Sequence, residues 1–260
     1  MCHDTLPVKH LGGVVPARRD QGGLMIRLIV CFGLLFSDSL LATDFLFIGD
    51  SHSAGVFGRK LDESLRTLPR ASVRTFARCA ATAQWWFDGT STYCGYFDRL
   101  SDGRIISFPD AIHAPTPLLT KLLAEPVSIG DRRVTVVALG SNDLGWLPAK
   151  VVGENVERMT DVIRKSGSEC IWVGPPSMRK FGDAKVAAMY TAIAGAVRAP
   201  GGDLCRIVDS RKYTNYPQTG GDGVHYNFKN GAEAAAKWAR GVFDEIRTAV
   251  STDQIENKEK

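Results

Sequence analysis

The sequence has no long block of like charge, since its net charge of +4 comes from acidic and basic residues mixed along the chain. It therefore gives no indication of a tail that binds nucleic acid. It also has no internal repeat and no low-complexity stretch. With 44% hydrophobic and 23% charged residues, it has the composition of an ordinary globular protein.

Metal-binding and nucleotide-binding patterns are also missing. The five histidines are scattered, and Cys79 and Cys94 do not have the spacing of a zinc-binding pair. No Gly-x-Gly-x-x-Gly follows a predicted strand, so no nucleotide cofactor is indicated. We therefore expect a protein that uses neither a metal nor a cofactor.

No apolar run near the N-terminus is long enough to span a bilayer as a helix. Residues 28–36 are apolar, follow a short basic start at Met25 and lead to a polar segment that ends at Ala42. This layout is typical of a secretory signal peptide cleaved after Ala42; the alternative is a buried first strand or helix. Residues 1–24 read as an upstream extension, and Cys31 lacks a lipoprotein cleavage signature. We therefore expect a periplasmic or secreted protein without a stable membrane anchor.

Removal of residues 1–42 would leave four of the six cysteines. An even number in an exported chain predicts two disulfides, for which three pairings exist. We favour Cys79–Cys94, which closes a local loop, and Cys170–Cys205, whose members each begin one of two consecutive predicted strands. The alternative is four buried free thiols, as in a cytosolic protein.

Apolar runs alternate with helical patterns along the mature chain. This alternation predicts a parallel sheet of about five strands, covered by helices on both faces and forming one domain over 43–250. A polar tail is expected over 251–260. The expected strands are 44–48, 72–76, 133–139, 170–173 and 205–208, and the expected helices are 56–68, 117–123, 151–166, 183–197 and 230–250.

One segment interrupts the alternation. Residues 85–117 are turn-rich and aromatic, and long loops in compact domains are usually functional or disordered. The aromatic content argues against disorder. Within this insertion, residues 97–108 have the pattern of a small hairpin around Ser101-Asp102-Gly103.

Polar residues follow the predicted strands at the sheet edge where parallel α/β proteins bind ligands. Ser51 follows the first strand and Asn142 the third, while Asp222 and His225 precede the last helix. A serine needs a base to become nucleophilic, and histidine oriented by a carboxylate is suited to that role. An asparagine amide can stabilise an oxyanion. These residue types predict acyl transfer, with Ser51 as nucleophile, His225 as base and Asp222 as its partner.

The motifs GDS at 49–51, GSND at 140–143 and DGVH at 222–225 occur in this order, each near the end of a predicted strand or before the last helix. Together they resemble the SGNH (GDSL) hydrolase family over nearly the whole mature chain. The resemblance implies a flavodoxin-like three-layer α/β/α sandwich and metal-free ester hydrolysis. It also implies an oxyanion hole formed by Asn142 with the backbone N–H groups of Ser51 and Ala80.

Ala80 departs from the family pattern, which has glycine at this place. Alanine keeps the backbone N–H but does not adopt a positive φ cheaply, so activity depends on an ordinary backbone at this position. Among nearby polar residues, Asp50 is expected to support the structure as a helix cap and His52 to be a loop residue. Asp143 is expected to anchor a turn.

Three tryptophans lie near these loops: Trp85, Trp86 and Trp146. Aromatic faces can stack on sugar rings, although core packing is an equally good explanation for each of them. Arg78 is interpreted either as a contact for an anionic substrate or as a surface charge.

The sequence therefore predicts an exported serine esterase that removes short acyl groups, most simply O-acetyl, from a polysaccharide such as peptidoglycan or from an acylated small molecule. A lipase or lysophospholipase and an O-acyltransferase of the same family are alternatives. An inactive carbohydrate-binding module is an alternative of another class. The oligomeric state cannot be read from the sequence.

Overall fold

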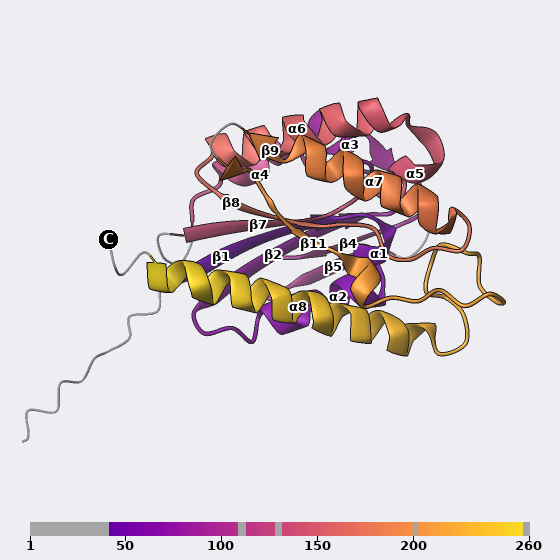
Figure 1. Ribbon diagram of the computed structural model, residues 1–260. Helices are drawn as coiled ribbons and strands as arrows, with labels where there is room; N and C mark the ends of the chain where they lie inside the picture. The colour runs from indigo at the N-terminus through magenta and orange to yellow at the C-terminus, as the bar shows by residue number, and fades with distance from the viewer. Residues whose placement is uncertain (1–41, 109–112, 128–131, 200–201, 257–260) are drawn as a thin grey trace, which may run out of the picture. The chain divides into compact units, whose positions relative to one another are not determined.

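The computed structural model describes residues 42–108, 113–127, 132–199 and 202–256 (Figure 1). The expected signal segment, apart from Ala42, lies outside these residues. Its processing therefore stays a prediction. None of the helices in the described ranges is long and apolar enough to cross a membrane.

The centre of the fold is a seven-stranded sheet with the order β11-β8-β7-β1-β2-β4-β5. The five strands from β11 to β2 are parallel, and β4 and β5 run antiparallel to their neighbours. The predicted number of five strands is too low, because the hairpin predicted in the insertion joins the edge of the sheet beside β2. The strands are β1 (Thr43–Gly49), β2 (Ala71–Arg78), β4 (Tyr96–Arg99), β5 (Ile105–Phe108), β7 (Arg132–Ala138), β8 (Glu169–Val173) and β11 (Arg206–Val208).

Helices cover both faces of this sheet, as the alternating pattern predicts (Figure 1). Figure 1 shows α2 and α8 on one face and α3, α4, α6 and α7 on the other. The fold is thus a three-layer α/β/α sandwich. The helices are α1 (Ser51–Ala54), α2 (Val56–Leu65), α3 (Trp85–Asp88), α4 (Leu119–Ala124), α5 (Asp143–Trp146), α6 (Ala149–Lys165), α7 (Gly182–Ala196) and α8 (Gly231–Glu256).

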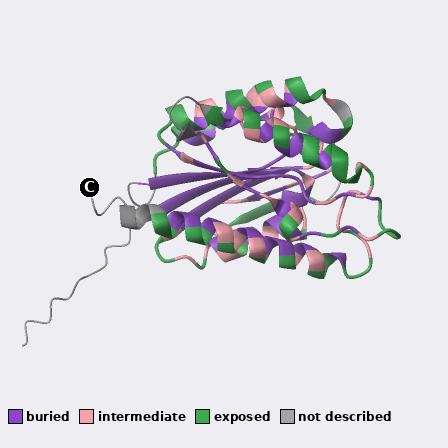
Figure 2. Cartoon of the chain, viewed as in Figure 1, coloured by how far each residue is buried: buried purple, intermediate pink, exposed green. Residues whose placement is uncertain are grey.

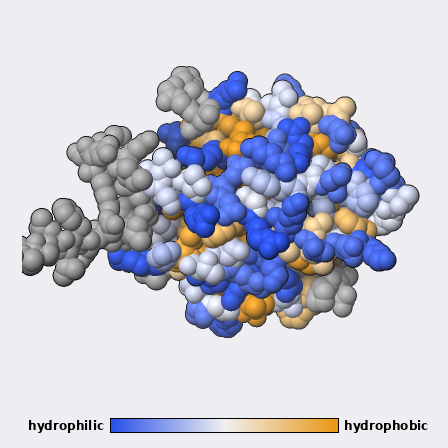
Figure 3. Space-filling model, turned by 60° about the horizontal axis from the view of Figure 1, so that its bottom comes forward, coloured by the Kyte–Doolittle hydropathy of each residue, from blue (hydrophilic) through white to orange (hydrophobic). Residues whose placement is uncertain are grey.

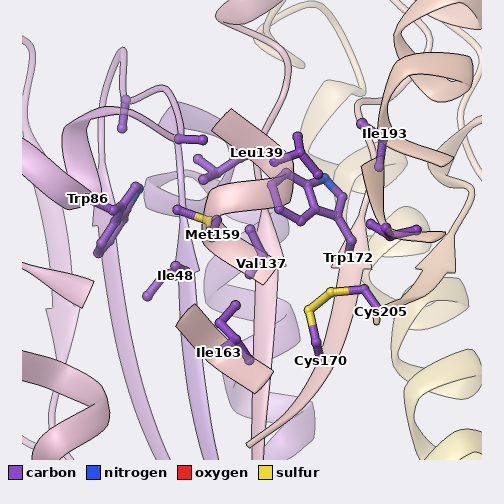
Figure 4. Close-up of a cluster of buried hydrophobic side chains, with 14 of the residues drawn as sticks. Ile48, Trp86, Val137, Leu139, Met159, Ile163, Cys170, Trp172, Ile193 and Cys205 are labelled. Carbon is purple, nitrogen blue, oxygen red and sulfur yellow. A yellow bond between two sulfur atoms is a disulfide. The ribbon is translucent and has the colours of Figure 1, made fainter. Parts of the chain in front are cut away.

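Strand β1 has no solvent-exposed face, since every one of its residues is buried. Phe45 and Phe47 pack toward the α2 and α8 layer. Leu46 and Ile48 alternate with them and pack toward the α6 and α7 layer. Figure 4 shows Ile48 in this cluster. This is the pattern of a central parallel strand, and Figure 2 shows the central parallel strands buried between the two helix layers. The edge strand β11 is only partly buried.

The outer surface has the opposite character. Hydrophilic side chains cover most of the face that carries α2 and α8, and hydrophobic side chains form only separate patches on it (Figure 3). Helix α8 continues to Glu256, so it takes in residues that the sequence analysis assigns to a polar tail. Amphipathic helix α6 begins two residues before its predicted start, at Ala149.

Two disulfides join the pairs that the sequence analysis favours, Cys79–Cys94 and Cys170–Cys205. The second links neighbouring parallel strands, because Arg206 of β11 pairs with Ile171 of β8 and each cysteine comes one residue earlier (Figure 4). The first joins the end of β2 to the insertion.

Short elements complete the insertion and the end of the α7 layer. Strand β3 (Ser91–Thr92) pairs antiparallel with β6 (Ala114–Pro115), and β9 (Arg198–Ala199) pairs with β10 (Gly202–Asp203). A 3-10 helix, η1 (Ser210–Lys212), follows β11. The β3–β6 pair holds the start of the insertion close to its end.

Candidate active site

The predicted site residues meet at the carboxyl edge of the parallel strands. Ser51 begins α1 directly after β1, and Asn142 follows β7. Ala80 lies in the turn after β2, and the loop before α8 supplies Asp222 and His225. The edge is rigid because each of these strands is hydrogen-bonded to its neighbours in register.

A chain of hydrogen bonds connects three of these side chains. Ser51 Oγ lies 2.9 Å from His225 Nε2. On the other side of the ring, His225 Nδ1 lies 2.7 Å from Asp222 Oδ2. When Nδ1 carries the proton, Nε2 is free to accept the proton of the serine hydroxyl.

Asp222 is held by the backbone of its own turn. Its Oδ1 accepts hydrogen bonds from the N–H of Val224 at 2.9 Å and from the N–H of His225 at 2.7 Å. Partial burial works against ionisation, but the hydrogen bonds from the His225 ring and from these two N–H groups outweigh it and lower the pKa of Asp222 to about 2. The carboxylate is therefore charged at neutral pH beside the imidazole.

Two residues that the sequence analysis missed support this turn. The Tyr216 hydroxyl donates to the carbonyl of His225 at 2.9 Å and accepts from the N–H of Gly223 at 3.0 Å. The Arg179 guanidinium donates to the carbonyls of Pro217 and Gly220, both at 2.9 Å. Tyr216 could have been noted as an aromatic residue in a turn-rich segment, but nothing in the sequence shows that its hydroxyl bridges the loop.

Residues 49–53 place the serine at the end of β1. Asp50 caps α1 by accepting a hydrogen bond from the N–H of His52 at 2.9 Å, the supporting role expected from the sequence. Gly49 is required by close packing, since a Cβ there would lie 2.0 Å from Ser53 Oγ. The backbone therefore turns tightly enough to present Ser51 at the sheet edge.

Buried titratable groups lie behind the serine. Burial raises the pKa of Asp50 to about 6. Burial, together with the charge of Asp50, raises the pKa of Asp143 to about 7, and its Oδ1 has no hydrogen-bond partner among the described residues. The sequence analysis expects Asp143 to anchor a turn, but the side chain is a buried acid. His52 lies in α1 and not in a loop, and it is buried. Burial lowers its pKa to about 3, so it is neutral.

Asn142 and Ala80 face each other across the edge on the α3 and α6 side. One N–H of the Asn142 amide donates to the carbonyl of Ala81 at 2.9 Å, which orients the amide and leaves its second N–H available. Ala80 has a φ of +68°, so the backbone here is not the ordinary one on which the sequence analysis makes the activity depend. Its N–H has no acceptor among the described residues.

Two cavities are lined by the predicted site residues. One of about 530 Å³ is lined by Ala80, Asn142 and Trp85 together with polar side chains of α3 and α6. The other, of about 370 Å³, is lined by Ser51 and His225 with residues of α2 and α8. Ser51 and His225 thus line one cavity, whereas Ala80 and Asn142 line the other.

The three tryptophans have different positions. Trp85 lines the larger cavity and is the one that can contact a ligand. Trp86 is fully buried in the core on the α6 side, so its predicted contact with substrate is wrong (Figure 4). The side chain of Trp146 lies outside the described part of the chain. Arg78 is neither a substrate contact nor a surface charge, because it is buried and paired with Asp98.

Comparisons with known proteins find this fold in esterases. The chain matches a protein provisionally named an arylesterase, from Agrobacterium tumefaciens, with a TM-score of 0.50 and 16% identity over 79% of this chain and 99% of the other. It matches the psychrotrophic esterase EstA from Pseudoalteromonas sp., inhibited by monoethylphosphonate, with a TM-score of 0.51 and 12% identity over 80% of this chain and 98% of the other. No profile of a known family and no curated protein sequence matches the chain.

Proposed function

We propose that this chain, which has the fold of those esterases, is a serine esterase of the SGNH (GDSL) hydrolase family. The observation that carries the proposal is the hydrogen-bonded chain from Ser51 through His225 to Asp222, at the sheet edge where α/β proteins bind ligands. Such a chain activates a hydroxyl for attack on a carbonyl carbon.

The proposed reaction has two steps. His225 Nε2 takes the proton of Ser51 as Oγ attacks the ester carbonyl, and it then gives that proton to the departing alkoxide, which leaves as an alcohol. Water then attacks the carbonyl carbon of the resulting acyl-enzyme, while His225 takes a proton from this water molecule. The acid departs, and the proton returns to Ser51. Asp222 keeps the imidazole in the required tautomer and stabilises its charged form in both steps.

In both steps the carbonyl oxygen becomes an oxyanion that needs donors. We assign this role to the available N–H of Asn142 and to the backbone N–H groups of Ala80 and Ser51. Loss of one such donor typically lowers kcat by about 10²- to 10³-fold. The positive φ of Ala80 does not remove its N–H, which therefore stays available for this proposed role.

The larger cavity indicates a carbohydrate substrate. Trp85 and Tyr93 supply aromatic faces, and Gln84, Asn155 and Thr82 supply hydrogen-bonding groups of the kind that sugar hydroxyls require. The one charged side chain among its described lining residues is Asp88. A carboxylate there disfavours the phosphate headgroup of a lysophospholipid. We therefore propose short acyl esters, most simply O-acetyl, on a cell-envelope polysaccharide such as peptidoglycan.

The cysteines favour export. Both disulfides involve buried or partly buried cysteines of the folded domain, and such bonds persist in oxidising compartments. This agrees with the signal peptide predicted over the N-terminal region. We therefore propose that the esterase acts in the periplasm or outside the cell.

The first experiment measures hydrolysis of 4-nitrophenyl acetate, butyrate and octanoate by the protein and by Ser51→Ala. Ser101→Ala, an exposed serine in the hairpin turn, is the matched control. We expect acetate turnover that is lost in Ser51→Ala and kept in Ser101→Ala. A reactive phosphonate monoester should also add one covalent group, found by peptide mass spectrometry on Ser51.

Preference for octanoate would favour a lipase, and equal rates in the protein and in Ser51→Ala would refute the proposed nucleophile. If no ester is cleaved and no phosphonate is bound, the chain is instead a binding module. A separate assay tests the polysaccharide part of the proposal by measuring release of acetate from acetylated peptidoglycan or xylan.

A further inference from the structure

The turn that carries Ala80 has a backbone that alanine does not prefer. The N–H of Ala81 donates to the carbonyl of Arg78 at 3.1 Å, which closes a four-residue turn. Within it φ is positive at the third position, Ala80, and not at the second, Cys79. This is the pattern of a type II turn, in which glycine is the favoured third residue.

The turn type decides where the N–H of Ala80 points. Type I and type II turns differ by a flip of the peptide between the second and third residues, here the Cys79–Ala80 peptide. The flip reverses both the carbonyl of Cys79 and the N–H of Ala80. Because alanine at the third position favours type I, the sequence of the turn alone would direct this N–H away from its present position.

One buried side chain opposes the flip. The hydroxyl of Thr92 donates to the carbonyl of Cys79 at 2.8 Å, and Thr92 is fully buried. The same oxygen also lies 3.1 Å from the carbonyl of Gly95, but a hydroxyl has one proton and the Cys79 carbonyl is the nearer acceptor. A flip would break this bond and turn the N–H of Ala80 toward the threonine oxygen, which already accepts from the N–H of Cys94 at 3.4 Å.

The segment that contains Thr92 is itself fastened to the turn. The disulfide Cys79–Cys94 joins the two, and the N–H of Cys79 donates to the carbonyl of Gly95 at 3.0 Å. Thr92 therefore cannot move away from Cys79 without loss of these connections.

We propose that Thr92, held in place by the Cys79–Cys94 disulfide, is a positioning residue that fixes the oxyanion-binding N–H of Ala80. Thr92 stabilises the type II turn by a tertiary contact, whereas a glycine at the third position would stabilise it by its own conformational preference. The inference rests on the proposed esterase function for its kinetic consequence, whereas its conformational part stands on the turn alone.

The kinetic test compares Thr92→Val with the double variant Thr92→Val/Ala80→Gly. Valine keeps the shape of threonine and removes the hydroxyl. We expect Thr92→Val to lower kcat for 4-nitrophenyl acetate by about tenfold, short of the 10²- to 10³-fold that full loss of a donor costs. KM should change by less than about twofold, because the N–H acts on the transition state. Glycine restores the type II preference, so the double variant should recover most of kcat.

Thr116→Val is the matched control. Thr116 is also buried in the insertion and donates its hydroxyl to a backbone carbonyl, that of Thr90, at 2.6 Å, but it does not contact the Cys79–Ala80 peptide. It should lose stability without the selective loss of kcat, and Ala80→Gly should not rescue it. Equal kcat losses in Thr92→Val and in the double variant would overturn the proposal.

A second measurement does not depend on activity. In the background that keeps Thr92, Ala80→Gly relieves an unfavourable φ and should raise Tm by about 2–4 °C. In the Thr92→Val background the turn is free to become type I, and the same substitution should then give no increase. An equal increase in both backgrounds would refute the role of Thr92 even if no ester is hydrolysed, and absence of hydrolysis with the expected Tm pattern would refute only the esterase proposal.

Discussion

Asp143 makes the stability of the fold depend on pH in a direction opposite to that of most paired carboxylates. It is 3% exposed and its Oδ1 has no partner among the described residues. Burial and the charge of Asp50 raise its pKa from 3.8 to about 7. The unfolded chain releases this proton near pH 4, whereas the folded protein keeps it to about pH 7, so the free energy of unfolding falls as pH rises between these values.

The size of this fall in the free energy of unfolding follows from the width of the pH interval between the two pKa values. Each pH unit over which only the folded state is protonated changes the free energy of unfolding by about 1.4 kcal/mol. Between pH 5 and pH 8 the interval for Asp143 covers about two units, so this group alone contributes a fall of about 2–3 kcal/mol. An asparagine side chain cannot ionise, so Asp143→Asn should remove most of this fall.

Urea unfolding followed by tryptophan fluorescence at pH 5, 6.5 and 8 tests the prediction. Asp183→Asn, at an exposed position in the first turn of α7, is the control and should keep the pH dependence of the unchanged protein. The reasoning is refuted if Asp143→Asn and the unchanged protein lose the same free energy of unfolding between pH 5 and pH 8.

Two further predictions concern contacts away from the serine. Tyr216→Phe removes the hydroxyl that bridges Gly223 and His225 and should lower kcat by about tenfold, measured with 4-nitrophenyl acetate; an unchanged kcat would show that the loop holds without it. Asp62 is fully buried and paired with Arg99 at 2.6 Å, so Asp62→Asn should reduce the free energy of unfolding by about 3–5 kcal/mol in urea titrations. A loss below about 1 kcal/mol would contradict that estimate.

The sequence predicts the layers of the fold well because its signals are local. Buried parallel strands are continuous apolar runs, such as that of β1, and the helices between them show their own periodicity. The hairpin at β4 and β5 is also visible as a local pattern. Its attachment to the edge of β2 is not, because strand pairing depends on contacts between residues far apart in the chain.

The site is predicted in part for the same reason. Ser51, Asn142, Asp222 and His225 follow from topology, which brings strand ends to one edge. Trp85 and Trp86 cannot be told apart from the sequence, because adjacent residues on a helix point about 100° apart and only tertiary packing decides which one is buried. The conformation of Ala80 depends on contacts with a distant segment, so no local signal reveals it.

The partial exposure of the site has a consequence for what can attack an acyl group on Ser51. The side chains of His225 and Asp222 are each 43% exposed. The imidazole is therefore accessible to bulk solvent, and no lid formed by the described residues closes over it. A water molecule can approach the base at any stage of turnover, whereas a second alcohol would have to be held there by specific contacts to compete with it. Exposure of the base thus favours transfer of the acyl group to water.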